Sequence, residues 1–291
     1  MPELPEVETI ARGLAKRVTG DIIESIWLGE KNEPLKSPAP EIAAALENTR
    51  ILTVRRVGKH IVLDLARDGV ERAPSPVKSR KSKSPHKEFP VPNAQSQFIV
   101  HLGMTGRLQV CDPQSEILKH THAIAKLASG RELRFVDPRR FGRLSVSADF
   151  AVAGLEPLEA DLDHFVPLFR RRKTPIKSAL LNQKLLRGVG NIYADESLFH
   201  AKIRPRRRAS SITRDQLAKL FTSVQEVLRE AIALGGSSIS DYVNSDGEEG
   251  FFQLKHRVYG REGEPCLVCK TPIKRIVIAG RSSHYCPKCQ K

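Results

Sequence analysis

The 291-residue sequence lacks any long hydrophobic run. No apolar stretch approaches the 18 or more residues of a membrane span, and no signal peptide precedes the first charged residues. We therefore expect a cytoplasmic, intracellular protein. Cysteine is also scarce: there are five, four of them in one cluster, which does not form a disulfide framework in a chain of this size. The lone Cys111 is expected to be a small buried hydrophobe.

Acidic residues are the next deficit, with 33 Asp and Glu against 48 Lys and Arg, for a formal net charge of +15. Such a charge indicates a polyanionic partner, most simply nucleic acid, although an anionic membrane or plain solubility would also be served. Hydrophobic residues make up 40% of the chain. That content predicts a sizeable core, divided between two domains.

The first nine residues, M-P-E-L-P-E-V-E-T, place two prolines among three glutamates. Removal of Met1 would leave the secondary amine of Pro2 beside the carboxylate of Glu3. An α-amino group titrates at roughly pH 8, more than two units below a lysine side chain, so an appreciable fraction is neutral near pH 7. Its attack on an aldehyde-like carbon gives an iminium, an electron sink that favours elimination. The pair is typical of a nucleophile beside an acid/base, and an ordinary helix start is the alternative interpretation.

A helix is predicted directly after this pair. Pro5 suits a first helical turn, where its missing N–H costs nothing, and Glu6 would lie near the positive end of the helix dipole. Apolar residues at helical spacing would bury one face of the helix and fix Pro2 and Glu3 in place. These residues are Val7, Ile10, Ala11, Leu14 and Val18.

The sequence from Asp21 to about Phe150 is predominantly of β type, and many short strands at close spacing predict a sandwich. A helix is expected around Glu41–Asn48. After Phe150 the pattern becomes helical, and the clearest helix is Arg214–Leu234, with Thr213 and Gln216 placed as a capping box. The predicted strands are Ile22–Leu28, Ile51–Val57, His60–Leu65, Phe98–Leu102, Arg107–Val110, Glu132–Val136 and Arg143–Val146.

Residues 67–97 fit neither pattern, because they are rich in Pro, Ser, Lys and Arg and have no hydrophobic period. We expect a disordered basic insertion, either a tether that touches phosphates or a solvated loop.

Four cysteines near the C-terminus form the motif that is most specific by itself. Cys266-x2-Cys269 and Cys286-x2-Cys289 are separated by 16 residues, the spacing of a tetrahedral zinc site. Four thiolate ligands leave no open coordination position, so we expect one structural Zn²⁺. Ile273–Ile278 and Ser282–Tyr285 can form a hairpin between the cysteine pairs, with Gly280-Arg281 in its turn.

A third motif is G-V-G-N-I-Y-A-D-E, which begins at Gly188. Within Lys184–Glu196 we predict one helix before the glycines and a second helix that begins at Asn191. Glycines before a helix N-terminus let backbone N–H groups approach a phosphate closely.

The N-terminal P-E-L-P-E-V-E-T string and the G-V-G-N-I-Y-A-D-E run resemble the formamidopyrimidine-DNA glycosylase family. The resemblance covers nearly the whole chain apart from 67–97. It implies a base-excision-repair enzyme, monomeric and nucleoid-associated, that removes oxidised purines from double-stranded DNA and cleaves the abasic strand by β- then δ-elimination. It also implies an α+β fold with an N-terminal catalytic β-sandwich domain (1–150), a helical helix-two-turn-helix domain (151–262) and a zinc finger (263–291).

The resemblance also assigns roles to residues. Pro2 would be the nucleophile and Glu3 the acid/base, with Glu6 in support; Lys59 would bind phosphate and donate a proton in β-elimination, and Arg281 would assist δ-elimination. Extrusion of a base costs a few kcal/mol for unstacking, and Met104, Arg139 and Phe141 would fill the space that the base leaves. Ser237–Tyr259 resembles a flexible loop that covers this base. The remaining DNA contacts implied are His101, His120, Arg172, Lys173 and Asn191.

Two alternatives stay open. An endonuclease VIII-type enzyme would share Pro2, Glu3 and the zinc hairpin but prefer oxidised pyrimidines. A non-enzymatic zinc-hairpin DNA-binding protein would need no Pro2–Glu3 pair.

Overall fold

A computed structural model describes residues 1–31, 33–67, 94–238, 243 and 247–291. Most of the basic insertion and part of the predicted covering loop therefore lie outside the described residues. The chain forms two compact units. Unit 1 contains residues 1–2, 6–151 and 238–250, and unit 2 contains residues 3–5, 152–237 and 251–291.

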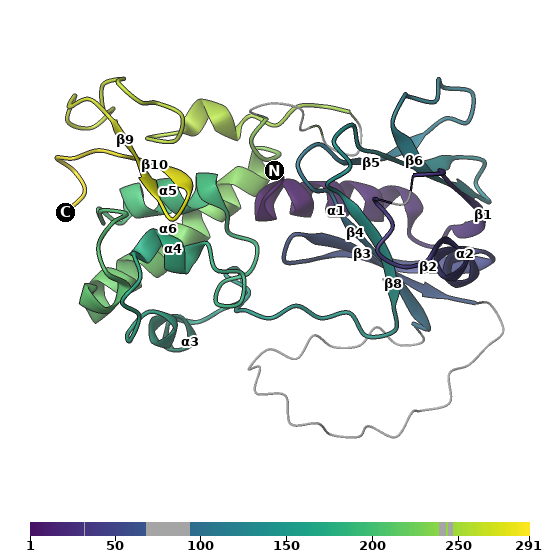
Figure 1. The fold of residues 1–291 in the computed structure, drawn as a ribbon, viewed down its shortest axis with the longest axis horizontal. Helices are drawn as coiled ribbons and strands as arrows, with labels where there is room; N and C mark the ends of the chain where they lie inside the picture. The colour runs from purple at the N-terminus through teal and green to yellow at the C-terminus, as the bar shows by residue number, and fades with distance from the viewer. Residues whose placement is uncertain (32, 68–93, 239–242, 244–246) are drawn as a thin grey trace. The chain divides into compact units, whose positions relative to one another are not determined.

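Unit 1 is built on one antiparallel sheet of eight strands, in the order β5-β7-β6-β1-β2-β3-β4-β8 (Figure 1). All seven predicted strands are present, and β6 was not predicted. Helix α2, Ala39–Leu46, begins two residues before the predicted helix. The strands are β1 Ile22–Leu28, β2 Thr49–Val57, β3 His60–Ala66, β4 Ser96–His101, β5 Arg107–Cys111, β6 Thr121–Leu127, β7 Glu132–Val136 and β8 Arg143–Ser147.

The core of unit 1 joins the sheet to helix α1, Leu4–Val18. The five apolar positions predicted for this helix are all buried. They share one cluster with Leu108 on β5 and Leu144 on β8, the two edge strands of the sheet. Strands from both edges of the sheet thus contact the same core. The predicted sandwich is therefore one sheet that folds over, in which each strand is hydrogen-bonded to the next.

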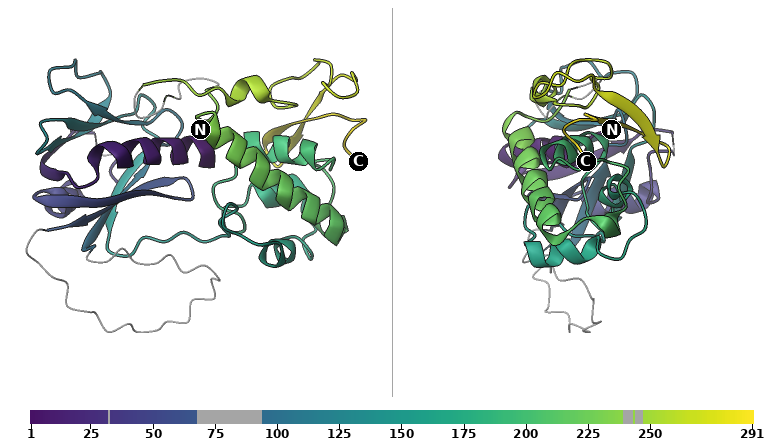
Figure 2. Two further views of the ribbon diagram at one scale, coloured as in Figure 1. Left: turned by 180° about the vertical axis from the view of Figure 1, so that it is seen from behind. Right: turned by 90° about the vertical axis from the view of Figure 1, so that its left-hand side faces the viewer.

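Unit 2 contains helices α3 (Leu162–Phe165), α4 (Ile176–Leu180), α5 (Asn191–His200) and α6 (Arg214–Ala233). Helices α5 and α6 pack against each other around a common core (Figure 2). The predicted capping box of α6 is present: Thr213 Oγ1 accepts from the Gln216 N–H, and Gln216 Oε1 accepts from the Thr213 N–H. A cap of this kind typically stabilises a helix by about 1 kcal/mol.

The helix expected to begin at Lys184 is wrong. Helix α4 ends at Leu180, and the chain reaches Gly188 through turns. Asn182 Oδ1 accepts from the Lys184 N–H and Gln183 Oε1 from the Gly188 N–H, at 3.0 and 2.9 Å. These side chains compete with helical hydrogen bonding and favour the turns.

The hairpin of unit 2 consists of β9, Lys274–Ile278, and β10, Arg281–Tyr285. Its turn is Ala279-Gly280, with φ of 47° and 75°, a two-residue turn with both central φ angles positive. The predicted turn was displaced by one residue, because Arg281 pairs with Ile278 as the first residue of β10.

In the part of the chain that the structure describes, no helix combines the length and the apolar character needed to cross a membrane.

Candidate active site

Glu3 is held at the N-terminus of helix α5. Its carboxylate is buried, with Oε1 accepting from the Ile192 N–H at 3.1 Å and Oε2 from the Tyr193 N–H at 3.5 Å. The first N–H groups of a helix have no partner within the helix and carry a partial positive charge, so a carboxylate is stabilised there. Pro2, also buried, is the next residue toward the N-terminus. The candidate acid/base is therefore fixed one residue from the candidate nucleophile.

The G-V-G motif receives this N-terminal segment. Leu4 N–H donates to the Gly188 carbonyl at 3.0 Å, and a Cβ on Gly188 would lie 2.8 Å from Leu4 Cδ1. A Cβ on Gly190 would overlap the Glu3 carboxylate. The glycines are thus required by the close approach of residues 3 and 4. The anion held at this helix N-terminus is the protein's own Glu3. The expectation that a phosphate also approaches the glycine backbone stays a prediction.

A buried ion pair attaches the hairpin to α4 and α5. Lys177 Nζ lies 2.7 Å from Asp195 Oδ1 and donates to the Ser282 carbonyl at 2.6 Å. Asp195 Oδ2 accepts from the His284 N–H at 2.9 Å. Burial lowers the pKa of Lys177, the Asp195 and Glu3 carboxylates raise it, and the Arg281 charge lowers it further. Glu3, Lys177 and Arg281 are therefore close enough to interact electrostatically.

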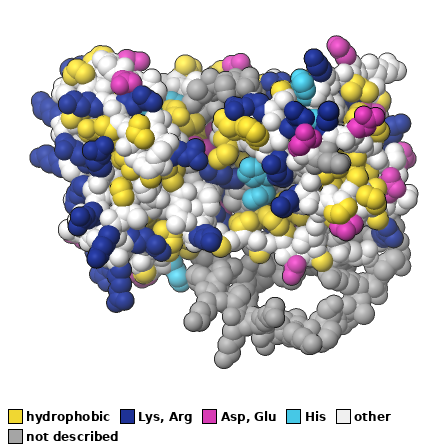
Figure 3. Space-filling model, viewed as in Figure 1, with side chains coloured by type: hydrophobic (Ala, Val, Ile, Leu, Met, Phe, Trp, Pro, Cys, Tyr) yellow, Lys and Arg dark blue, Asp and Glu magenta, His cyan; other side chains and the backbone are white. Residues whose placement is uncertain are grey.

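Asn191 is the first residue of α5 and is half-buried, with Nδ2 3.4 Å from Ser282 Oγ. Arg172 and Lys173 are exposed in the turn before α4. Arg172 Nε donates to the Leu168 carbonyl. The side chain is exposed, so the other nitrogens of its guanidinium face solvent. In Figure 3, Lys and Arg side chains are spread widely over unit 2. This face suits a polyanion.

Lys59 lies in unit 1, in the two-residue turn Gly58-Lys59 between β2 and β3. It is only 9% exposed, so it is not an ordinary solvated lysine. Arg56 Nη1 donates to the Gly58 carbonyl at 3.1 Å, while Arg56 Nε donates to Glu8 Oε2 at 2.7 Å. Helix α1 thereby holds the turn that carries Lys59. Glu6, in the first turn of α1, is buried as well.

His101 ends β4, and its Nδ1 accepts from the Gly103 N–H at 3.1 Å. The His60 ring lies 4.9 Å away between centroids. Burial, aided by the charges of His60, Lys59 and Arg143, lowers the pKa of His101 to about 4. The imidazole is consequently neutral at pH 7 and can accept or donate a hydrogen bond.

Two loops of unit 1 expose the predicted void-filling residues. Met104 is 40% exposed and Phe141 is 49% exposed, which confirms that both side chains reach the surface. Arg139 places its guanidinium carbon 4.9 Å from the centre of the Phe141 ring, a cation–π geometry. His120 is exposed in the turn that precedes β6, with φ of 85°.

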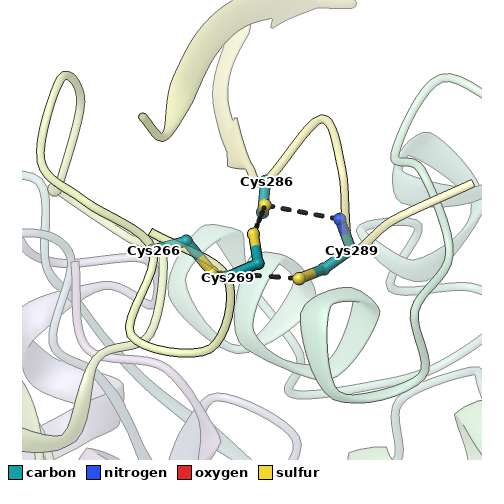
Figure 4. Close-up of side chains that lie close together, drawn as sticks. All are labelled: Cys266, Cys269, Cys286 and Cys289. Atoms are coloured by element: carbon teal, nitrogen blue, oxygen red, sulfur yellow. Dashed lines mark hydrogen bonds between the residues drawn. The ribbon is translucent and has the colours of Figure 1, made fainter. Parts of the chain in front are cut away.

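The four clustered cysteines point toward one another (Figure 4), and their Sγ atoms all lie within 4.8 Å. Cys269 and Cys286 Sγ are 3.4 Å apart, and Cys266 and Cys289 Sγ are 3.9 Å apart. Tetrahedral Zn–S bonds of about 2.3 Å require sulfur atoms about 3.8 Å apart. The cysteines are therefore positioned to bind a metal ion.

Cys111 differs from the expectation, because it is half-buried at the end of edge strand β5. Burial raises its pKa, so the thiolate is a minor species at neutral pH.

Lys177 and Asp195 were not predicted as part of this region. Lys177 is the one charged residue in the mostly apolar run P-I-K-S-A-L-L, and a single charge in such a run was the available signal.

Three family models match the chain. They are the formamidopyrimidine-DNA glycosylase N-terminal domain over residues 1–144, the formamidopyrimidine-DNA glycosylase H2TH domain over 153–243, and the zinc finger found in FPG and IleRS over 263–291. The formamidopyrimidine-DNA glycosylases of Solibacter usitatus and Roseobacter denitrificans are 44% and 40% identical, each over 100% of both chains.

Solved structures agree with these matches. The MutM (FPG) protein of Thermus thermophilus has a TM-score of 0.81 and 38% identity, covering 99% of this chain and 98% of that one. A Lactococcus lactis FPG mutant in complex with a Fapy-dG containing DNA has a TM-score of 0.84 and 31% identity, covering 100% of both chains. Because the three family models match the sheet, the helices and the four-cysteine finger, and full-length relatives are this similar, the chain belongs to the formamidopyrimidine-DNA glycosylase family.

Proposed function

We propose that this protein is a DNA glycosylase and AP lyase of base-excision repair that acts on oxidised purines, such as 8-oxoguanine and formamidopyrimidines, in double-stranded DNA. The observation that carries the proposal is the fixed carboxylate of Glu3, held by the α5 N-terminus one residue from Pro2. A DNA-binding module without chemistry would not need a buried carboxylate beside its terminal amine.

The chemistry proposed begins at Pro2, once Met1 has been removed. The Pro2 nitrogen forms a bond to C1′ of the damaged nucleotide as the bond from C1′ to the base breaks. Glu3 transfers protons during sugar-ring opening and base release. The resulting iminium acidifies C2′, and loss of that proton expels the 3′ phosphate in β-elimination, followed by the 5′ phosphate in δ-elimination. Lys59 would bind phosphate and donate a proton in β-elimination. Arg281 would bind phosphate and assist δ-elimination, and Glu6 would support the Pro2–Glu3 pair.

The remaining side chains would bind the extruded nucleotide and its surroundings. Met104, Arg139 and Phe141 would occupy the space that the base leaves in the duplex. Further contacts to the DNA backbone are assigned to exposed or half-buried polar residues. These are His101, His120, Arg172, Lys173 and Asn191.

For the metal site we propose one structural Zn²⁺ held by Cys266, Cys269, Cys286 and Cys289. Thiolates in four tetrahedral positions supply folding energy and leave no position for a reactant. We also propose that the protein acts inside the cell as a monomer. Its division is proposed as a catalytic domain (1–150), a helix-two-turn-helix domain (151–262) and a zinc finger (263–291).

Borohydride reduction during incubation with an 8-oxoguanine duplex tests this function. A covalent complex that peptide mapping assigns to Pro2 is expected, because reduction traps an iminium. Glu3→Gln should fold and bind the damaged duplex but release base at least about 100-fold more slowly, the scale of lost acid/base catalysis. Trapping at a lysine such as Lys59 would contradict the mechanism. Faster release from a duplex containing an oxidised pyrimidine would favour the endonuclease VIII-type alternative.

A further inference from the structure

The buried carboxylate of Asp137 joins the loops of unit 1 that carry the exposed side chains of Met104, Arg139 and Phe141. Asp137 is fully buried. Its Oδ1 accepts from Thr105 Oγ1 at 2.6 Å and from the Arg139 N–H at 3.3 Å, and its Oδ2 accepts from the Gly142 N–H at 2.7 Å. Hydrogen bonds to an ionised acceptor are about twice as strong as neutral ones, so this carboxylate is a firm anchor.

Each of these bonds ends beside a side chain that is exposed. Thr105 directly follows Met104, Arg139 is bound through its own N–H, and Gly142 directly follows Phe141. The backbone of Asp137 extends the connection, because its N–H donates to the His120 carbonyl at 3.0 Å and its carbonyl lies 3.0 Å from His122 Nε2. One residue thus fixes three loop segments relative to one another.

The loops pack closely at two glycines, so they have no room to shift when a hydrogen bond to Asp137 is lost. A Cβ on Gly103, whose φ is 65°, would lie 2.5 Å from the Gly142 nitrogen. A Cβ on Gly142 would lie 2.5 Å from Phe135 Cζ and 3.0 Å from Asp137 Oδ2. The two loops therefore meet backbone to backbone, and the Asp137 hydrogen bonds set how far apart Met104 and Phe141 stand.

We propose that Asp137 is a positioning residue for base extrusion: it presents Met104, Arg139 and Phe141 as one preorganised wedge for the gap left by the damaged base. This inference rests on the proposed function. Asp137 touches neither the base nor the sugar, since its carboxylate is enclosed by its three donors. Its effect acts through the three side chains that enter the duplex.

The wedge matters for one substrate class more than another. Removal of 8-oxoguanine requires a stacked, paired base to leave the helix, which costs a few kcal/mol. A preformed abasic site has no base to unstack, so the sugar reaches the Pro2 amine without that cost. Loss of Asp137 should therefore separate base excision from strand cleavage at an abasic site.

The experiment compares Asp137→Asn with wild type on both substrates under single-turnover conditions. Asn keeps the shape but replaces one acceptor oxygen with a donor, which faces an existing donor. We expect at least a tenfold slower excision of 8-oxoguanine and less than a threefold change at a preformed abasic site. A 2-aminopurine placed beside the lesion should show a smaller rise in fluorescence. Asp112→Asn, in the exposed turn where Asp112 Oδ1 accepts from the Gln114 N–H, is the matched control and should resemble wild type.

Thr105 gives a second, milder variant. Thr105→Val replaces the hydroxyl with a methyl group of similar size, and an intermediate loss of excision is expected. Thr105→Ser keeps the hydroxyl and should restore the wild-type ratio. Equal losses on both substrates would show a merely structural role and overturn the inference, as would unchanged excision in Asp137→Asn. Failure of the proposed function is distinguishable, because wild type would then give no borohydride-trapped complex with either substrate.

Discussion

The β9–β10 hairpin and the paired loops of unit 1 both present exposed side chains at chain turns, but they are held in different ways. The hairpin depends on the cysteine cluster and on the Lys177–Asp195 ion pair. The loops extend from a sheet with a large core and depend on one carboxylate, Asp137. A region with little apolar surface needs metal and charge to be ordered, whereas hydrogen bonds are enough for loops already placed by a core.

Removal of the metal should give the largest effect and break the hairpin alone. Among the described residues, the hydrophobic cluster there is small, and its buried members are Phe199, Val258, Ile273, Cys266 and Cys286. Such a core cannot fold the segment without the ion. Chelation, or Cys269→Ser, should weaken binding to an abasic-site duplex at least about 100-fold, a loss of about 2.7 kcal/mol or more, measured by fluorescence anisotropy.

Cys111→Ser is the matched control for this prediction, since Cys111 lies in unit 1 outside the cluster. It should change neither the metal content nor the affinity. Full strand cleavage by metal-free protein would refute the dependence of the hairpin on the ion.

Disruption of the ion pair behind the hairpin should leave the protein folded but less stable. Asp195→Asn leaves the Lys177 charge buried without its carboxylate, at a cost of about 3 to 5 kcal/mol in the free energy of unfolding. Urea denaturation measures this. Lys177→Met combined with Asp195→Leu should cost less than the two single changes added together, because no isolated charge remains.

The exposed pair Arg214–Asp163 serves as the comparison within unit 2. Its side chains are largely in solvent, so Arg214→Ala should cost about 1 kcal/mol or less. If Asp195→Asn and Arg214→Ala lower the free energy of unfolding by similar amounts, burial does not make the Lys177–Asp195 pair more important than an exposed pair.

Acidification should have the smallest effect on the free energy of unfolding. A histidine in each unit allows this effect to be compared between the units. The pKa of His101 falls from 6.5 to about 4 on folding, mainly through burial. The unfolded chain therefore binds more protons between these values, and stability that is present above pH 6.5 is lost as pH falls toward 4. His101→Gln should reduce this slope by up to about 1.4 kcal/mol per pH unit, the value for one proton.

His256 provides the same test in unit 2, where burial also lowers its pKa to about 4. Urea denaturation from pH 7 to 4 would compare His256→Gln with His101→Gln. A slope unchanged in both variants would mean that neither imidazole stays neutral in the folded protein.

Features set by nearby residues were predictable from the sequence. The four cysteines, the capping box at Thr213 and the buried face of α1 all depend on spacing within a few turns of chain. Strand β6, T-H-A-I-A-K-L, was missed because its alanines have low β propensity, and burial between β1 and β7 decides its conformation instead.

Features set by distant residues were not predictable. Glu3 and its donor Ile192 are 189 positions apart, so no local pattern could connect them. Charged residues are rarely fully buried unless they are paired. Lys177, Asp195 and Glu196 are all buried, because each meets a partner from another segment. The Pro2–Glu3 pair and the four cysteines were predicted from the residues themselves, and the resemblance to the family added the candidate DNA contacts. The residues that hold these groups in place were seen only in the fold.

Helix α5 ties several of these supports to a single element. Its first N–H groups hold Glu3, Asp195 holds the hairpin, and Glu196 accepts from the N–H groups of Arg257, Val258 and Tyr259. A copy of the protein in which α5 fails to form loses all three attachments at once. The Glu3 carboxylate, the hairpin and the segment that begins at Arg257 are therefore ordered together, because one helix holds all three.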